Sequence, residues 1–182
     1  FQFDLFPFLA TCLVLLVFLP FQVAWEECMF RGYLMQGFAA LFRYRWVPFV
    51  LTSLIFGLMH GANPEVVKFG FWMTMPQYIL MGLILGYVAV KDDGIELALG
   101  VHFINNFLTA ILVTHEASAM PTNALFVDTD PGISPWDALV IAACGLLFIW
   151  LCNMKYHFIA NNKLREKIKS ERNIVPLASK ID

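Results

Sequence analysis

The chain has 182 residues, of which 59% are hydrophobic and only 14% are charged, with a mean hydropathy of +0.68. Soluble domains carry about 25% charged residues, so this composition excludes an ordinary soluble domain and predicts an integral membrane protein. The net charge of −2 gives no reason to expect a nucleic acid as partner.

The apolar runs predict an all-α fold, a polytopic transmembrane bundle of about five to six helices. The first run covers residues 5–25, close to the ~20 residues that span a bilayer, and residues 26–42 keep a helical pattern. Further helices are expected at residues 46–60, 68–90, 95–114 and 136–158. Turns are expected at residues 61–65 and 91–94, and a hydrophilic loop at residues 115–135.

We expect residues 1–160 to form one transmembrane domain that lacks upstream spans, followed by a basic polar tail over residues 161–182. A straight helix over residues 5–42 would be ~57 Å long, nearly twice the ~30 Å membrane core. Either the chain kinks or breaks near Pro20, or a long helix projects from the membrane. In a competing topology residues 27–42 lie on the surface as an amphipathic helix, which would place Glu26 near that surface.

Basic residues indicate the orientation, because Lys and Arg collect in cytoplasmic loops. The basic residues that mark two of the turns are Arg43, Arg45 and Lys91. Seven of the twelve basic residues follow from Lys155 onward. This pattern predicts a cytoplasmic C-terminus and places the loop over residues 115–135 outside, with Lys68 as the one exception.

Several polar residues interrupt the apolar helices, where an ionisable group is costly and indicates function. They are Glu26, Glu27, Arg31, His60, His102, Asn105 and Asn106. Glu27 and Arg31 are four residues apart with the acid first, which favours a helical ion pair. Glu26 is then left free, and a free carboxylate in a low-dielectric site can act as a base near neutral pH.

Helix lengths place these residues at similar depth. Counted from the turn at residues 43–45, Glu26 lies about 25 Å and His60 about 22 Å along two arms of a hairpin. His102 lies roughly 12–15 Å from the turn at residues 91–94, and helix tilt could absorb the difference of ~10 Å. We therefore expect two acids, two histidines and an amide to meet nearer the middle of the membrane than either surface.

A structural interpretation exists for each residue taken singly. A membrane histidine can simply bond a neighbouring helix, so His60 and His102 fit structure and catalysis equally well. The Glu27–Arg31 pair is more typical of a structural role, and Asn105 of helix packing. The occurrence of three helical spacings together favours a functional site.

The three spacings resemble the motifs of the CAAX-protease and bacteriocin-processing (CPBP, or Abi) family of intramembrane proteases, over about residues 15–115. The motifs are Glu-Glu-x-x-x-Arg at Glu26, Glu27 and Arg31, Phe-x-x-x-His at Phe56 and His60, and His-x-x-x-Asn at His102 and Asn106. The resemblance implies that Glu26, with His60, activates a water for attack on a peptide carbonyl. It also implies that His102 and Asn106 stabilise the oxyanion, and that Glu27 and Arg31 position Glu26.

The family is often labelled a metalloprotease, although the spacing is not His-Glu-x-x-His. A zinc ion bound by His60, His102 and Glu26 is chemically reasonable, since two histidines and one glutamate form a known catalytic set. We favour the mechanism without a metal.

The leading hypothesis is an intramembrane endopeptidase, similar to CAAX prenyl protease 2, that cuts a peptide or protein substrate near its C-terminus, whether or not the substrate is lipidated. The compact chain with short loops favours a prokaryotic plasma membrane. One alternative is a transporter or proton relay, against which no inverted repeat is found. Another is a non-catalytic scaffold for bacteriocin self-immunity.

The Gly82-x-x-x-Gly86 pattern fits internal packing as well as a homo-oligomer.

Overall fold

The computed structural model describes residues 1–158 and residue 164. It is a helical bundle, which confirms the predicted fold class, with one very short pair of strands. The predicted boundary near residue 160 and the predicted tail over residues 161–182 lie outside the described residues, apart from residue 164, and stay predictions.

The first element is one long helix. It comprises α1 (Leu5–Glu27), a π-helical segment η1 (Cys28–Leu34) and α2 (Met35–Leu41). Pro20 lies inside α1, so the expected break near Pro20 is absent and the structure has the continuous helix. The irregular turn begins instead at Cys28, where hydrogen bonds of the i→i+5 type widen the helix. Such turns are frequent at functional sites, and this one directly follows the paired glutamates.

The next four elements form a hairpin with a bent connection. They are α3 (Trp46–Met59), the 3₁₀ turn η2 (His60–Ala62), the short helix α4 (Pro64–Phe69) and α5 (Phe71–Asp92). The sequence predicted one helix from residue 68, but the structure divides it at Gly70. The φ angle of Gly70 is 92°, a value that glycine adopts readily, and α4 ends at this residue.

The remaining elements are α6 (Glu96–Leu112), β1 (Val113–Thr114), β2 (Phe126–Val127) and α7 (Pro135–Tyr156). The two strands pair in parallel with Val113 opposite Phe126, inside the region that the sequence predicted as loop. A capping box starts α7, with the Ser134 amide donating to the Asp137 carboxylate at 2.7 Å. This bond satisfies a backbone donor that the helix leaves unpaired.

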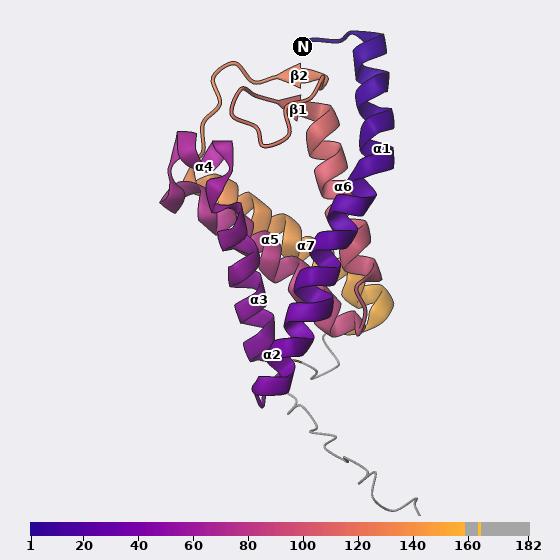
Figure 1. The fold of residues 1–182 in the computed structure, drawn as a ribbon, viewed down its shortest axis with the longest axis vertical. Coiled ribbons are helices and arrows are strands. Elements are labelled where there is room, and N and C mark those ends of the chain that lie inside the picture. Colours follow the sequence, from indigo (N-terminus) through magenta and orange to yellow (C-terminus); the bar gives the residue numbers. More distant parts are fainter. Residues whose placement is uncertain (159–163, 165–182) are drawn as a thin grey trace, which may run out of the picture.

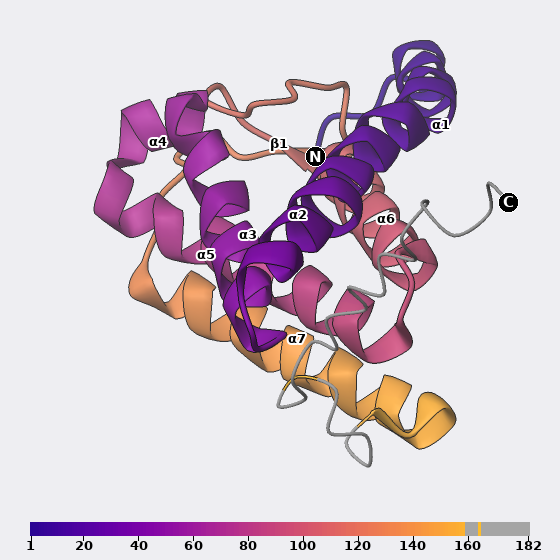
Figure 2. The same cartoon turned by 60° about the horizontal axis from the view of Figure 1, so that its bottom comes forward.

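Helix α5 occupies the centre of the bundle. It packs mainly against α3 and also contacts α6 and α7, while α1 lies along α6 and the η1–α2 part of the long helix contacts α3. In Figure 1 the strands and the N-terminus lie at one end and α2 at the other. Figure 2 shows α7 along the edge of the bundle away from α1. The long helix thus carries its glutamates between α6 and α3.

Two glycines of α5 let it approach α3 closely. A Cβ on Gly82 would lie 2.7 Å from the backbone oxygen of Ser53, and one on Gly86 would lie 3.0 Å from Ser53 Oγ. The small-x-x-x-small face is therefore covered by another helix of the same chain, so internal packing explains the pattern.

Three helices in the described part of the chain are long and apolar enough to cross a membrane: Leu5–Leu41, Phe71–Asp92 and Pro135–Tyr156. The other two expected spans are shorter apolar helices, Trp46–Ala62 and Glu96–Leu112. At ~1.5 Å per residue each is about 25 Å long, slightly less than the ~30 Å core. The helices are those of a membrane protein.

Ion pairs connect the turns at each end of the bundle. Arg45 Nη1 lies 3.2 Å from Asp93 Oδ1, so the basic turns at residues 43–45 and 91–94 share one end. Lys68 pairs with Glu116 and joins α4 to the segment after β1. The hydrogen bond and the charge of Lys68 lower the pKa of Glu116. The predicted grouping of the turns agrees with these contacts, and their side of the membrane stays a prediction.

Candidate active site

The carboxylate of Glu27 is the centre of the candidate site. It lies at the end of α1 and is fully buried, with 0% of its surface exposed. Its Oε1 atom accepts hydrogen bonds from Arg31 Nη1 at 2.8 Å and from His102 Nδ1 at 2.7 Å. The predicted Glu27–Arg31 ion pair is therefore present, and the same oxygen also holds a histidine of α6.

Arg31 carries the buried positive charge beside Glu27. Its Nη2 donates to the backbone oxygen of Gly82 on α5 at 3.1 Å, and Ser53 Oγ donates to the same oxygen at 3.0 Å. Its guanidinium carbon lies 4.5 Å from the centre of the Phe56 ring on α3. A guanidinium is suited to both contacts, because it is planar and stacks on aromatic rings. One side chain thus joins the long helix to α3 and α5.

Glu26 differs from Glu27 in exposure and in partners. Its side chain is 12% exposed, and its Oε1 accepts a hydrogen bond from Gln22, one turn earlier. Its Oε2 is buried and has no hydrogen-bond partner among the described residues. This oxygen lies 3.7 Å from His102 Nε2, too far for a direct hydrogen bond. Glu27 Oε2 is likewise buried without a hydrogen-bond partner among the described residues. The two glutamates therefore differ in exposure and in the partners of Oε1, which are Arg31 and His102 for Glu27 and Gln22 for Glu26.

The ring of His102 reaches both glutamates. Because the carboxylate of Glu27 accepts the hydrogen bond, Nδ1 carries the hydrogen, and Nε2 is the atom nearer Glu26. A carboxylate bonded to one ring nitrogen fixes the orientation of the imidazole and the tautomer of its neutral form. His102 is thus a histidine neighbour of Glu26, and the predicted action of Glu26 together with His60 stays a prediction.

His60 lies beside this cluster. Its Nδ1 donates to the backbone oxygen of Phe56 at 2.8 Å, and because a carbonyl only accepts, Nε2 carries the lone pair in the neutral ring. The His60 ring stacks on Tyr78 of α5, with centroids 4.4 Å apart and 19° between the planes. Phe56 contacts both histidines, its centroid lying 4.8 Å from that of His60 and 5.8 Å from that of His102.

Asn106 follows His102 by one turn on the same face of α6. Its Oδ1 accepts a hydrogen bond from Asn105 Nδ2 at 3.1 Å. This hydrogen bond lies within α6. The structure thus brings Glu26, Glu27, Arg31 and His102 into one cluster. Phe56 connects His60 to this cluster, and Asn106 lies one helical turn after His102.

The predicted alternative zinc site does not fit this arrangement. In the described part of the chain, no three His, Cys, Asp or Glu side chains lie close enough together to hold a metal ion. A site of two histidines and one glutamate needs all three donors at about 2.0–2.2 Å from the ion. His60, His102 and Glu26 do not provide that donor set here.

Three supporting residues were missed in the sequence. Gln22 precedes Glu26 by one helical turn, a spacing that could have indicated the contact. Ser53 acts through the backbone oxygen of Gly82, which has no signature in the sequence. Tyr78 lies in an apolar helix, and only the fold reveals its contact with His60.

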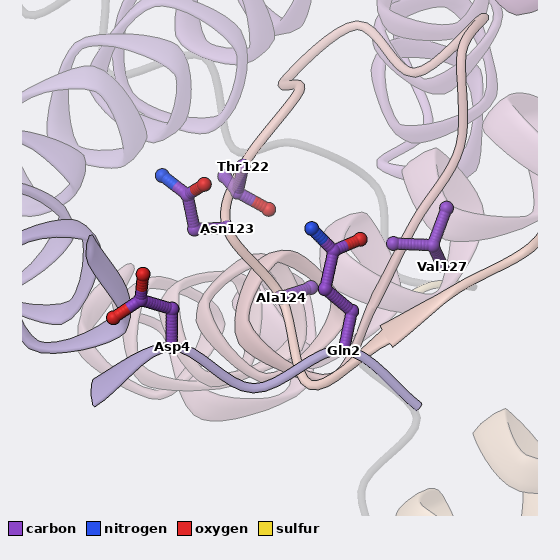
Figure 3. A pocket seen from close by; sticks show the side chains of 6 residues that line it. All are labelled: Gln2, Asp4, Thr122, Asn123, Ala124 and Val127. Carbon is purple, nitrogen blue, oxygen red and sulfur yellow. The ribbon is translucent and has the colours of Figure 1, made fainter. Parts of the chain in front are cut away.

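A separate small pocket lies near the N-terminus (Figure 3). Its lining residues are Gln2, Asp4, Thr122, Asn123, Ala124 and Val127. About 33 Å of helix separates Asp4 from Glu26, at ~1.5 Å per residue. The pocket is therefore remote from the glutamate–histidine cluster and contains no histidine.

Comparison with known proteins gives a family and a relative. Residues 8–108 match the model of the Rce1-like family, described as type II CAAX prenyl endopeptidase Rce1-like. The chain is also similar to the uncharacterized protein YyaK of Bacillus subtilis (strain 168), with 27% identity over 162 residues, or 89% of this chain and 54% of that protein. The chain thus spans about half the length of this relative. No solved structure matches.

Proposed function

This chain belongs to the Rce1-like family of type II CAAX prenyl endopeptidases, and on that premise we propose that it is an intramembrane endopeptidase. The family makes a peptidase the general kind of activity expected. The proposed reaction is hydrolysis of a peptide bond near the C-terminus of a protein or peptide substrate, without a metal ion.

One observation supports this proposal more than any other. Glu26 Oε2 is buried without a hydrogen-bond partner among the described residues and lies 3.7 Å from His102 Nε2. A carboxylate oxygen that is sheltered from bulk water and beside an imidazole is suited to accept a proton from a water molecule. Glu27 Oε2 is also buried without a hydrogen-bond partner among the described residues. The Glu27 carboxylate is fully buried and bonded to Arg31 and His102 through Oε1, whereas the Glu26 side chain is 12% exposed, which favours Glu26 as the group that a water molecule reaches.

In the proposed mechanism, Glu26 Oε2 removes a proton from a bound water as the water oxygen attacks the carbonyl carbon of the substrate. The carbonyl electron pair moves to its oxygen, and the resulting oxyanion accepts hydrogen bonds from His102 and Asn106. A hydrogen bond from His102 to the oxyanion requires a hydrogen on Nε2 in addition to the Nδ1–H that Glu27 accepts. As the peptide bond breaks, Glu26 returns the proton to the leaving nitrogen.

His60 has the second proposed role in water activation. Its Nδ1–H is held by the Phe56 carbonyl, so the Nε2 lone pair can accept a hydrogen bond from the same water. Glu27 and Arg31 position the reacting groups, since they join α1, α5 and α6 through buried hydrogen bonds.

The proposed substrate is a peptide tail, lipidated or not, that enters the bundle from the bilayer. We place the protein in a prokaryotic plasma membrane with its C-terminus in the cytoplasm. The basic turns at residues 43–45 and 91–94 support this orientation, and the Arg45–Asp93 ion pair is consistent with a shared end.

The test is cleavage of an internally quenched, farnesylated peptide with a CaaX end by the purified wild type and Glu26→Ala. The matched control is Glu96→Ala, which removes an exposed acid in the first turn of α6. We expect cleavage by the wild type and the control and none by Glu26→Ala. Equal cleavage by Glu26→Ala would contradict the assignment to this residue. No cleavage by the wild type would contradict prenyl-peptide hydrolysis.

A further inference from the structure

A second polar cluster lies against His60 and is formed by Asn63, Glu65 and Tyr78. The Tyr78 hydroxyl donates a hydrogen bond to Glu65 Oε1 and accepts one from Asn63 Nδ2 at 2.9 Å. Asn63 is the N-cap of α4 and Glu65 lies in its first turn, whereas Tyr78 comes from α5. The hydroxyl therefore uses its donor and an acceptor position, and the Tyr78 ring is fixed between two elements.

This ring is in turn stacked on His60, with centroids 4.4 Å apart and 19° between the planes. His60 begins the 3₁₀ turn η2, where the regular helix α3 has ended. Its imidazole is held by two contacts, the hydrogen bond from Nδ1 to Phe56 at 2.8 Å and the stack on Tyr78. The hydrogen bond sets which ring edge faces the backbone, and the stack sets the plane of the ring. Together they fix the direction of Nε2.

We propose that Tyr78 is a positioning residue for His60, and that Glu65 and Asn63 position Tyr78. This inference rests on the proposed function, because Tyr78 would influence cleavage only through the imidazole of His60. A misplacement of about 1 Å in a reacting group can lower a rate on the order of 10²-fold, so a ring that fixes a catalytic imidazole has a measurable effect.

The polar contacts of Tyr78 distinguish this role from simple packing. A phenylalanine would fill nearly the same space in an apolar helix without the need for polar partners. Here a half-buried hydroxyl is bonded to a carboxylate whose other oxygen, Glu65 Oε2, is buried without a partner among the described residues. This arrangement has a desolvation cost that a packing residue would avoid. It is explained if the orientation of the ring matters.

The test compares Tyr78→Leu, which removes the stack, with Tyr78→Phe and Glu65→Gln, which keep the ring but weaken its anchor. The control is Tyr87→Phe, a partly buried tyrosine of the same helix. Two readouts are needed: kcat and KM for the farnesylated CaaX peptide, and the ¹⁵N chemical shifts of the His60 ring in histidine-labelled protein. His60→Gln assigns the His60 signals among the four histidines of the chain.

We expect Tyr78→Leu to lower kcat on the order of 10- to 100-fold with little change in KM, and to shift the His60 ring signals. Tyr78→Phe and Glu65→Gln should give smaller changes in the same direction, and Tyr87→Phe should match the wild type. A drop in kcat with unchanged His60 signals would overturn the inference, and so would wild-type kcat in Tyr78→Leu.

The two proposals can fail separately. If the wild type does not cleave the peptide, the proposed function fails, and the His60 signals still decide whether Tyr78 positions the ring. If Tyr78→Leu does not fold, Tyr78→Phe and Glu65→Gln decide the question. Wild-type His60 signals in both of these variants would then overturn the inference.

Discussion

His102 and Glu27 are 75 positions apart in the sequence, yet His102 Nδ1 donates to Glu27 Oε1 at 2.7 Å. The bond is buried and joins α6 to the end of α1. Since Arg31 donates to the same oxygen, Glu27 organises two other side chains. Glu26, one residue earlier, accepts a hydrogen bond from Gln22 of its own helix, and its side chain is 12% exposed. Adjacent glutamates should therefore respond differently to the same substitution.

We predict that Glu27→Gln reduces stability and Glu26→Gln does not. Glu27→Gln leaves Arg31 without its buried counter-charge, and breaking a buried ion pair costs about 3–5 kcal/mol. Glu26 forms its hydrogen bond with Gln22 through Oε1, an acceptor that glutamine keeps, and its Oε2 has no hydrogen-bond partner among the described residues. Glu26→Gln should therefore change the free energy of unfolding by less than about 1 kcal/mol. Denaturant unfolding in detergent measures both. Equal losses in the two variants would contradict the division of roles.

Arg31→Lys should also destabilise the protein, although the charge is kept. An ammonium cannot reproduce the planar contacts of the guanidinium with Glu27, Gly82 and Phe56. Loss of a hydrogen bond to a charged group costs about 1.5–3 kcal/mol. The matched control is Arg43→Lys at an exposed turn, which should leave the unfolding midpoint unchanged. An equal effect of both substitutions would argue against a special role for the guanidinium.

Gly82→Ala should loosen the contact between α3 and α5. The added Cβ would lie 2.7 Å from the Ser53 backbone oxygen, so one helix must move, and overpacking of this kind costs about 1–3 kcal/mol. Because Arg31 binds the Gly82 oxygen, activity should fall as well. Gly100→Ala is the control, since a Cβ there meets nothing within 4 Å. It should be neutral or slightly stabilising in the same unfolding measurement.

The contact between Lys68 and Glu116 should weaken in acid. The hydrogen bond from Lys68, and then its charge, lower the pKa of Glu116 below the ordinary value of 4.5. A carboxyl with a depressed folded pKa adds stability above its unfolded pKa and loses it as the pH falls through the folded pKa. The contact should thus persist at neutral pH and be lost below pH 4.5. Both groups are exposed, so global stability should change little.

The Glu116 titration can be followed by the NMR shift of its carboxyl carbon. In Lys68→Met the carboxyl should titrate at higher pH than in the wild type, because the neighbouring charge and donor are gone. Identical titration curves for the two proteins would show that Lys68 has no influence on Glu116.

Removal of metal ions should leave cleavage unchanged if the proposed mechanism is correct. The candidate ligands His60, His102 and Glu26 do not converge on a common point in this arrangement. A titration with chelator, checked by elemental analysis of the protein, measures this. Loss of activity that zinc alone restores would contradict the mechanism.

The glutamate cluster was accessible from the sequence because charge is costly in an apolar helix and helical spacing sets faces. Glu26, Glu27 and Arg31 follow from these rules, and the Glu27–Arg31 pair is confirmed. His102 was placed in the same cluster, but at a level ~10 Å away, because the count assumed straight, parallel helices. In the structure α6 lies along α1 and removes that offset.

The neighbours of His60 could not be predicted in the same way. Its contact with Tyr78 depends on the break at Gly70, whose positive φ ends α4 and lets α5 return along α3. The sequence placed residue 68 at the start of a single helix, because the turn signals before it were stronger. Ring stacking between separate helices has no periodic signature, so it appears only once the helices are packed.

The π-helical segment that begins at Cys28 has a consequence for how the long helix tolerates length changes. Its wide turns alter the phase of the helix, so that the upstream half keeps its face on α6 while the downstream half presents its face to α3. A one-residue deletion at Cys28, Met29 or Phe30 would shorten the spacing between Glu27 and Arg31 and rotate one side chain relative to the other, and a deletion at Gly32–Leu34 would change the phase of the downstream half. Insertions and deletions should therefore be accepted near either end of the long helix and rejected between Glu27 and Leu34.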